Sequence, residues 1–247
     1  MSAAASSLYA SSVFQSIAGG AWRPGGTALT RHGLELCALA PGSTVLDVGC
    51  GSGASLALAR EIGLNGTGLD RECSLTEPFP FVQADAQNPP FPDASFDAIL
   101  CECVLSLLPD AWQALHRFAE ILKPGGKLLL SDLFVRGGEP SAAPSPGASC
   151  LAGARTRQET ERLLTEHGFV LLHFEDHTAS LKELAARLLW YGDESVCGFL
   201  RGGRSAEAGA SRDCACGSLR PGGLRYGYGL WIAAPARKTS RGDAQET

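Results

Sequence analysis

A glycine-rich turn between an apolar segment and a candidate helix carries the clearest chemical signal in the sequence. Residues 45–53 read Val-Leu-Asp-Val-Gly-Cys-Gly-Ser-Gly, and the glycines allow a sharp turn and a close approach of the backbone to a ligand. Asp47 lies before the turn, and Asp70 closes the next apolar run roughly 20 residues further on, where a ribose hydroxyl acceptor is expected. The spacing predicts a nucleotide-type binding turn.

The elements around this turn alternate between strands and helices, which is typical of a parallel sheet covered on both faces. We predict strands at 44–48, 66–70, 81–84, 96–101 and 127–131. Helices are predicted at 30–38, 55–62 and 111–122, the last of them ending at Lys123-Pro-Gly-Gly126. A helix that opens with a Thr156/Glu159 capping box leads to a sixth strand at 169–174, and a seventh is predicted at 229–233.

The glycine turn also carries a family resemblance. Asp47-Val-Gly-Cys-Gly-Ser-Gly53 resembles motif I of class I S-adenosylmethionine (SAM) methyltransferases, and the resemblance continues through 84–86, 91–97 and 122–126. It implies an α/β fold, namely the Rossmann-like doubly wound seven-stranded sheet of that family, with SAM as the cofactor. Only residues 71–80 stand where the family has a helix, so we expect that helix to be shortened or lost.

The same resemblance implies which residues contact SAM. Asp85 would accept a hydrogen bond from the adenine amino group, the alternative being a plain turn aspartate. Glu102, at the end of the fourth predicted strand, is also predicted to contact SAM. The alternatives are that it raises the pKa of the Cys103 thiol, that it contacts substrate, or that it is solvated, as carboxylates at strand ends often are. The predicted cofactor-binding residues are Asp47, Gly49, Cys50, Gly51, Gly53, Asp70, Asp85, Ala86 and Glu102.

Nine cysteines in a chain without a recognisable secretion signal favour thiols over a disulfide framework. Cys37, Cys50 and Cys101 are interpreted as small packing residues. Cys103 and Cys150 resemble the binding cysteines of arsenite methyltransferases, which makes these two the predicted catalytic residues. A third thiol is left open among Cys37, Cys73, Cys197, Cys214 and Cys216.

The sequence leaves three hypotheses for the activity. The first is a SAM-dependent methyltransferase that acts on trivalent arsenic or another soft, thiol-bound acceptor, because thiolates bind soft centres well. The second is a methyltransferase of a small organic or thiol metabolite, in which the cysteines are structural. The third is a thiol-based metal-binding or redox protein without turnover.

Composition and charge set the remaining expectations. A net charge of -5 without a basic block argues against nucleic acid as a partner, and the short apolar runs argue against a membrane span. We expect a cytoplasmic protein with a small-molecule or metalloid substrate, and the oligomeric state stays open. His173 and His177, with Glu175 and Asp176, lack a defined ligand geometry in sequence, so no metal site is predicted.

The sequence divides into five segments. We predict an N-terminal segment that is a candidate lid, a SAM-binding core, a helical and Cys/Gly-rich insertion between strands six and seven, the last strand, and a disordered tail. Within the insertion, Ser180 and Glu183 are expected to cap a helix. The five segments are 1–29, 30–175, 176–225, 226–236 and 237–247.

Overall fold

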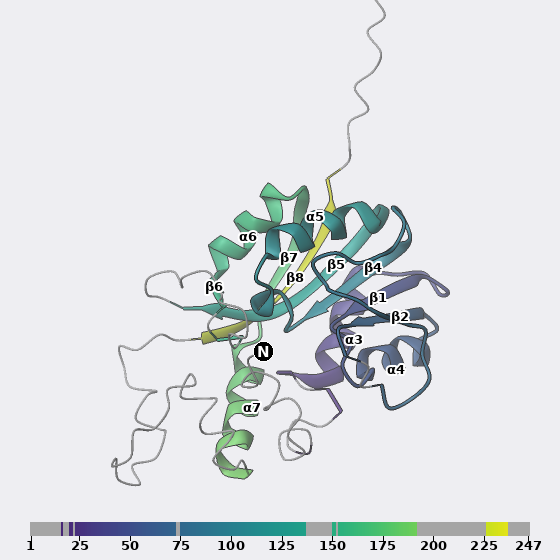
Figure 1. The fold of residues 1–247 in the computed structure, drawn as a ribbon. Coiled ribbons are helices and arrows are strands. Elements are labelled where there is room, and N and C mark those ends of the chain that lie inside the picture. The colour runs from purple at the N-terminus through teal and green to yellow at the C-terminus, as the bar shows by residue number, and fades with distance from the viewer. Residues whose placement is uncertain are drawn as a thin grey trace, which may run out of the picture.

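The fold is a mixed sheet with helices on both faces (Figure 1). The computed structural model describes residues 16, 20–21, 23–72, 75–136, 150–151, 153–191 and 226–236. The strands are β1 (Thr44–Val48), β2 (Asn65–Asp70), β3 (Phe81–Gln83), β4 (Phe96–Glu102), β5 (Leu122–Val135), β6 (Arg155–Thr156), β7 (Phe169–Asp176) and β8 (Tyr226–Pro235). The helices are α3 (Gly26–Cys37), α4 (Ala54–Glu61), the 3-10 turn η1 (Leu105–Leu107), α5 (Ala111–Ile121), α6 (Arg157–Glu166) and α7 (Thr178–Tyr191).

Strand order confirms the predicted doubly wound sheet. The order is β3-β2-β1-β4-β5-β8-β7, with the short β6 paired to β5 outside this path. Strands β1 to β5 pair in parallel, whereas β8 runs antiparallel to both β5 and β7. The carboxyl ends of β1, β4, β5 and β7 therefore lie at one edge of the sheet, where open α/β sheets bind ligands.

Two apolar clusters fill the spaces between the sheet and its helices. The first contains Leu115 and Phe118 of α5 with Leu164 of α6, and the second contains Leu29 and Leu34 of α3. Figure 1 shows α5 and α6 on one side of the sheet and α3 and α4 on the other. Buried apolar runs such as Leu128-Leu-Leu130 explain why the central strands face protein on both sides.

Two predicted helix starts are wrong. Helix α3 begins at Gly26 rather than at residue 30, and α7 begins at Thr178, two residues before the predicted Ser180 cap. The α7 start is explained by Asp176, whose Oδ1 accepts a hydrogen bond from the Thr178 amide at 2.9 Å and another from the Thr178 hydroxyl.

Other local predictions are confirmed. Thr156 and Glu159 form the capping box, and α5 ends at Ile121. The predicted strand start at residue 127 is wrong, because β5 begins at Leu122, which pairs with Phe96 of β4. Residues 75–80 contain no helix, in agreement with the shortened segment after β2. Of the predicted insertion, α7 is described, and residues 192–225 and the tail 237–247 lie outside the described residues. Among the helices that the structure describes, none has the length and apolar character needed to cross a membrane.

Candidate active site

The glycine loop after β1 is fastened to the end of β2 by backbone hydrogen bonds. The amides of Gly49 and Cys50 both donate to the Leu69 carbonyl, at 2.7 and 3.2 Å, and the Gly51 amide donates to Asp70 Oδ2 at 3.0 Å. Gly49 has φ 70°, and a Cβ there would lie 2.4 Å from Val104 Cγ2. A side chain at position 49 would therefore disturb both the loop and the segment after β4.

The side chain of Asp47 is buried under this loop with one oxygen unsatisfied. Asp47 is 3 % exposed, and its Oδ2 has no hydrogen-bond partner in the described part of the chain. Burial, followed by the charge of Glu102, raises the Asp47 pKa from 3.8 to about 8, although Arg23 opposes the rise. An unsatisfied buried carboxyl group beside a glycine loop is the arrangement expected of a site that receives a cationic or hydrogen-bond-donating group.

Glu102 and Arg23 form a buried ion pair beside Asp47. Arg23 Nη2 lies 2.9 Å from Glu102 Oε2 and donates to the Ser55 hydroxyl at 2.8 Å. Thr30 and Ser55 donate to Glu102, each at 3.0 Å, and Arg23 also donates to Thr30. The expectation that a carboxylate at this strand end is solvated is therefore wrong, because α3 and Arg23 cover Glu102 and satisfy its oxygens.

Arg23 keeps one unsatisfied donor in this buried cluster. Its Nε has no hydrogen-bond partner among the described residues. Burial lowers the pKa of the Arg23 guanidinium. The negative charges of Glu102, Tyr228 and Asp47 together have the larger effect, so the Arg23 pKa is raised. A permanently charged donor and an unsatisfied carboxyl oxygen thus lie in one buried cluster.

Asp70 and Asp85 lie at the ends of neighbouring strands. Asp70 Oδ1 accepts from the Glu72 amide at 3.2 Å, in addition to the bond from Gly51. Asp85 is exposed, and its Oδ1 accepts from the Gln87 amide at 2.8 Å, as in an Asx turn. Ala86 beside it is buried. Contacts of Asp70, Asp85 and Ala86 with a cofactor stay predictions.

Cys103, which follows β4, begins a chain of hydrogen bonds that ends at Glu102. Its Sγ lies 3.2 Å from the Tyr228 hydroxyl, which lies 2.9 Å from Ser131 Oγ. Ser131 Oγ donates to Glu102 Oε1 at 3.5 Å. Burial, with Asp132 next, raises the Cys103 pKa well above its usual value, so the group is a neutral thiol at pH 7.

Cys150 lies in the same apolar cluster as Tyr228, with Cys103 packed against that cluster. It is 8 % exposed. The two cysteines thus border one apolar cluster, although 46 positions separate them in the sequence, and their joint role stays a prediction. Cys103 also has φ 57°, an uncommon value for a residue with a side chain.

The other described cysteines do not extend this pair. Burial raises the Cys37 pKa to about 12, and the charge of Lys127 opposes this rise. Lys127 lies nearer the amino end of β5, whereas Ser131 lies further along that strand. Cys50 and Cys101 are buried, so the packing interpretation of all three agrees with their burial. Cys73, Cys197, Cys214 and Cys216 lie outside the described residues.

Sequence reasoning missed the polar residues that complete the site. Thr30, Ser55, Ser131 and Tyr228 come from α3, α4, β5 and β8 and carry no motif. Arg23 has a weak signal, because it stands in the segment predicted as a candidate lid. These residues meet only through sheet order and helix packing, which a linear motif does not record.

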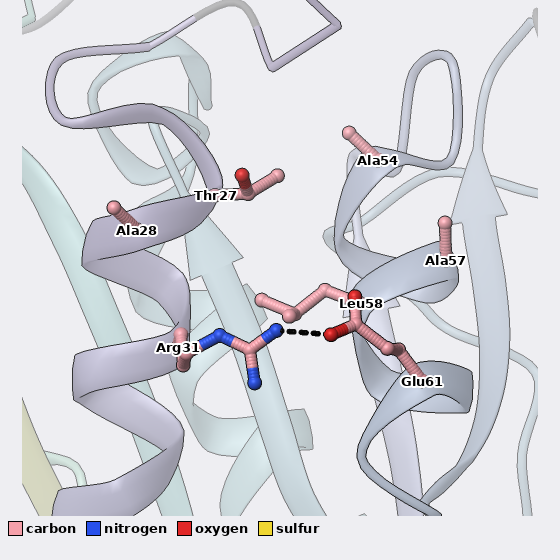
Figure 2. Close-up of a pocket in the computed structure, with 7 residues that line it drawn as sticks. All are labelled: Thr27, Ala28, Arg31, Ala54, Ala57, Leu58 and Glu61. Atoms are coloured by element: carbon pink, nitrogen blue, oxygen red, sulfur yellow. Dashed lines mark hydrogen bonds and ion pairs between the residues drawn. The ribbon is translucent and has the colours of Figure 1, made fainter.

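A separate groove lies between α3 and α4 (Figure 2). It is lined by Thr27, Ala28, Arg31, Ala54, Ala57, Leu58 and Glu61. Arg31 and Glu61 form an ion pair of 2.6 Å across it. Because its two charged residues neutralise each other and both are well exposed, we assign the groove no part in the chemistry.

Comparison with known proteins places the glycine loop in a family. Residues 46–130 match the family described as "Methyltransferase domain". The 27-O-demethylrifamycin SV methyltransferase of Amycolatopsis mediterranei is 28 % identical over 171 residues, which cover 64 % of this chain and 58 % of that protein. The arsenite methyltransferase of Halobacterium salinarum is 29 % identical over 150 residues, which cover 53 % and 38 % of the two proteins. The match thus spans 38 to 58 % of these relatives' own lengths.

The fold has a close counterpart among solved structures. Phosphoethanolamine N-methyltransferase 2 of Haemonchus contortus, in complex with phosphomonomethylethanolamine and S-adenosylhomocysteine, superposes with a TM-score of 0.71 at 18 % identity. The superposition covers 91 % of this chain and 56 % of that one, and at this identity it is evidence for the fold alone. The matched domain, these relatives and the strand order together support a methyltransferase domain of the class I fold in this chain.

Proposed function

We propose that the chain binds SAM at the glycine loop and transfers its methyl group to a small acceptor. The unsatisfied Oδ2 of Asp47, buried beneath the loop, is the observation that carries this proposal. A buried carboxyl oxygen without a partner is costly, so its presence is best explained by a ligand that completes it.

The donor set at the loop fits the chemistry of SAM. Asp47 suits an ammonium group, the Arg23 guanidinium suits a carboxylate, and Asp70 suits a ribose hydroxyl. The ligand would supply a methyl group on a positively charged sulfur, which leaves as a neutral thioether when a nucleophile takes the methyl carbon.

The chain's own residues position the reactants and exclude water. Gly49 keeps the space beside Val104 free of a side chain, and Arg23 neutralises the buried charge of Glu102 at the end of β4. Most of the predicted lid segment lies outside the described residues, and Arg23 is the residue of it that pairs with the sheet, through Glu102. Alignment in a dry site is the main contribution expected from the protein.

Calorimetric titration of the full chain with SAM and with S-adenosylhomocysteine tests cofactor binding. Asp70→Asn should weaken the binding of SAM and of S-adenosylhomocysteine by about 10-fold, because a hydrogen bond to a charged acceptor contributes a free energy of about that size. Asp93→Asn is the matched control, because this exposed aspartate precedes β4 at the opposite edge of the sheet. Equal affinities for wild type and Asp70→Asn would contradict the placement of the ribose.

For the acceptor we propose trivalent arsenic, held by the thiolates of Cys103 and Cys150. The packing of Cys103 against the apolar cluster that contains Cys150 supports it, and an arsenite methyltransferase is among the relatives. Thiols bind a soft trivalent centre with release of their protons, which offsets the raised pKa of Cys103. An organic or thiol metabolite is the second candidate, since the rifamycin enzyme is among the relatives as well.

Incubation with SAM, arsenite and a thiol reductant distinguishes the two acceptors. Methylated arsenic together with S-adenosylhomocysteine supports the first, and Cys103→Ser and Cys150→Ser should each abolish it while SAM still binds. Cys37→Ser is the control thiol, because Cys37 lies near Lys127, away from the pair. SAM binding without methylarsenic, and with no arsenite bound, would reject arsenic as the acceptor and leave the cofactor proposal intact.

A further inference from the structure

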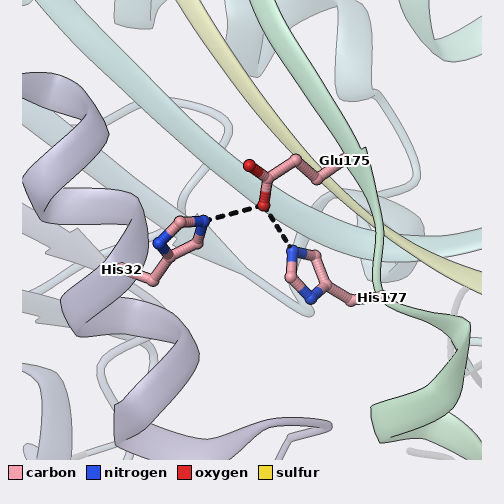
Figure 3. Close-up of side chains that lie close together, drawn as sticks. All are labelled: His32, Glu175 and His177. Carbon is pink, nitrogen blue, oxygen red and sulfur yellow. Dashed lines mark hydrogen bonds and ion pairs between the residues drawn. The ribbon is translucent and has the colours of Figure 1, made fainter.

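Two histidines from different elements converge on one carboxylate outside the proposed cofactor site (Figure 3). His32 of α3 and His177, which precedes α7, each place Nε2 at 2.8 Å from Glu175 Oε2. The three potential ligand atoms lie within 4.8 Å of one another. Figure 3 shows both rings pointing at the same carboxylate. His32 is 143 residues away from Glu175 in sequence, so only the fold assembles this group.

The strand register shows how the group relates to the cofactor side. Glu175 pairs with Leu230, Leu230 with Ser131, and Ser131 with Glu102, so these residues form one row across the sheet. Paired residues of neighbouring strands point to the same face. Glu175 and Glu102 therefore lie on one face, three strand spacings or ~14 Å apart.

Helix α3 covers this face and reaches both carboxylates. Thr30 donates to Glu102, and His32 bonds to Glu175. Gly33 permits the close approach, because a Cβ there would lie 2.5 Å from Leu129 Cδ1. The histidine group thus lies at the carboxyl edge of the sheet, where ligands bind in this class of fold.

From these positions we propose that His32, Glu175 and His177 bind a divalent transition metal ion of the zinc class. Two imidazoles and one carboxylate form the ligand set of many zinc sites that keep a position open for water or substrate. Two ligands of a tetrahedral zinc ion lie roughly 3.3 Å apart, so the 2.8 Å contacts need to open by about half an ångström. The side chains of His32, Glu175 and His177 are 43, 29 and 24 % exposed, which gives an ion access from solvent.

Two further contacts orient the ligands. His173 Nε2 bonds to the other carboxylate oxygen of Glu175 at 2.8 Å, and the His177 amide donates to the Tyr228 carbonyl at 2.7 Å. Outer partners of this kind hold metal ligands in place. The hydrogen bond from His173, and next those from His177 and His32, lower the Glu175 pKa to about 2 against the effect of burial, so the carboxylate is ionised at neutral pH.

Titration of the full chain with Co²⁺, followed by its visible and near-ultraviolet absorption, tests the site despite the nine cysteines. Thiolate ligands give intense near-ultraviolet charge-transfer bands, whereas a nitrogen and oxygen site gives only the visible bands. We expect the visible bands to reach their plateau at one Co²⁺ per chain, and Zn²⁺ to displace that ion. His32→Ala and His177→Ala should each weaken this binding by at least the 10- to 100-fold typical for loss of an outer partner.

His116→Ala is the matched control, because His116 pairs with Glu120 on α5 and is absent from the group. Glu175→Gln preserves the size of the side chain and tests the carboxylate if an alanine variant unfolds. Co²⁺ spectra that do not change in His32→Ala and Glu175→Gln, or that contain only thiolate bands, would overturn the proposal. Because neither readout involves SAM, failure of the methyltransferase proposal would leave this result unaffected.

Discussion

Burial beneath the glycine loop disfavours the ionised form of the Asp47 carboxyl group, and a bound cation would favour it. Asp47 has a pKa of about 8, so at pH 7 the free protein holds it mostly protonated. Its unfolded pKa is 3.8, so the folded chain binds one more proton than the unfolded chain between these two values. Folding stability is therefore lost as the pH rises towards 8, and a cationic ligand would offset that loss.

Asp47→Asn should separate stability from binding. The variant cannot ionise, so its free energy of unfolding should exceed that of wild type by a few kcal/mol (~2–4) at pH 8, with the difference shrinking towards pH 4. The same change should weaken SAM binding by about 10- to 100-fold, because a hydrogen bond to a charged group is lost. Urea unfolding and calorimetry across pH 4 to 8 measure both quantities.

Asp97→Asn provides the contrast in that series, because the pKa of Asp97 is shifted in the opposite direction. A variant of Asp47 that is destabilised equally at every pH would mean that the carboxylate has a partner in the free protein. Unchanged SAM affinity would remove Asp47 from the cofactor site.

Gly49→Ala should be more costly than Gly63→Ala, although both glycines have positive φ. Their φ values are 70° and 79°, so the backbone term is similar, about 1–2 kcal/mol for a residue with a side chain. A Cβ at 49 would lie 2.4 Å from Val104 Cγ2, whereas nothing lies within 4 Å at 63. We expect an additional ~1–3 kcal/mol at position 49 from this overlap, measured by thermal unfolding. Equal losses would show that Val104 moves aside freely.

At the scale of elements, the strands were the most predictable part of the fold. The apolar runs at β1 and β4 and the capping box of α6 are local signals, and they appear where predicted. The start of α3 was missed because Gly26 and Thr27 have weak helix propensity, and the first residues of the helix that pack against the sheet are Leu29 and Thr30. Such packing leaves no mark in a window of the sequence.

The site was predictable only where a motif is contiguous. The glycine loop and Asp70 lie together as the pattern requires. Glu102 was misjudged because its partners Arg23, Thr30 and Ser55 come from three other segments. The histidine group was missed for the same reason: His173 and His177 lack a third ligand until α3 brings His32 across the sheet.

The amino ends of β1 and β4 are joined by a polar contact that should respond to pH. Asp97 Oδ2 accepts from the Thr44 amide and from Lys123 Nζ, each at 2.8 Å, and the Lys123 bond is the main cause of its lowered pKa. A lowered folded pKa gives stability that is present above the unfolded value of 3.8 and is lost as the pH falls below it.

Asp97→Asn should therefore destabilise the protein by about 1 kcal/mol at pH 7, a value that allows for screening of this partly exposed pair. The difference from wild type should shrink as the pH falls below 3.8. Urea titrations at several pH values measure it, with Asp93→Asn as an exposed control. A loss of the same size at pH 3 would assign the effect to the shape of the side chain rather than to its charge.

At the scale of the whole molecule, α3 links the two proposed binding sites. One side of the helix holds Glu102 and Arg23 through Thr30, and another holds Glu175 through His32. The cofactor side and the histidine group therefore share one rigid element with close packing at Gly33. Two ligands that both fix the position of one helix are coupled, and the coupling is reciprocal by thermodynamic necessity.

Zinc should consequently tighten SAM binding. If the ion holds α3 against β7, the cofactor has less of the helix to order when it binds. The SAM affinity should therefore rise by a few-fold, at the lower end of the usual coupling free energy of about 1–3 kcal/mol. Calorimetric titration of SAM with and without one equivalent of Zn²⁺ measures it in wild type and in His32→Ala. The gain should disappear in His32→Ala and persist in His116→Ala. An equal gain in His32→Ala would place the responsible zinc ion on the thiols, and no gain in wild type would show that α3 is already fixed without metal.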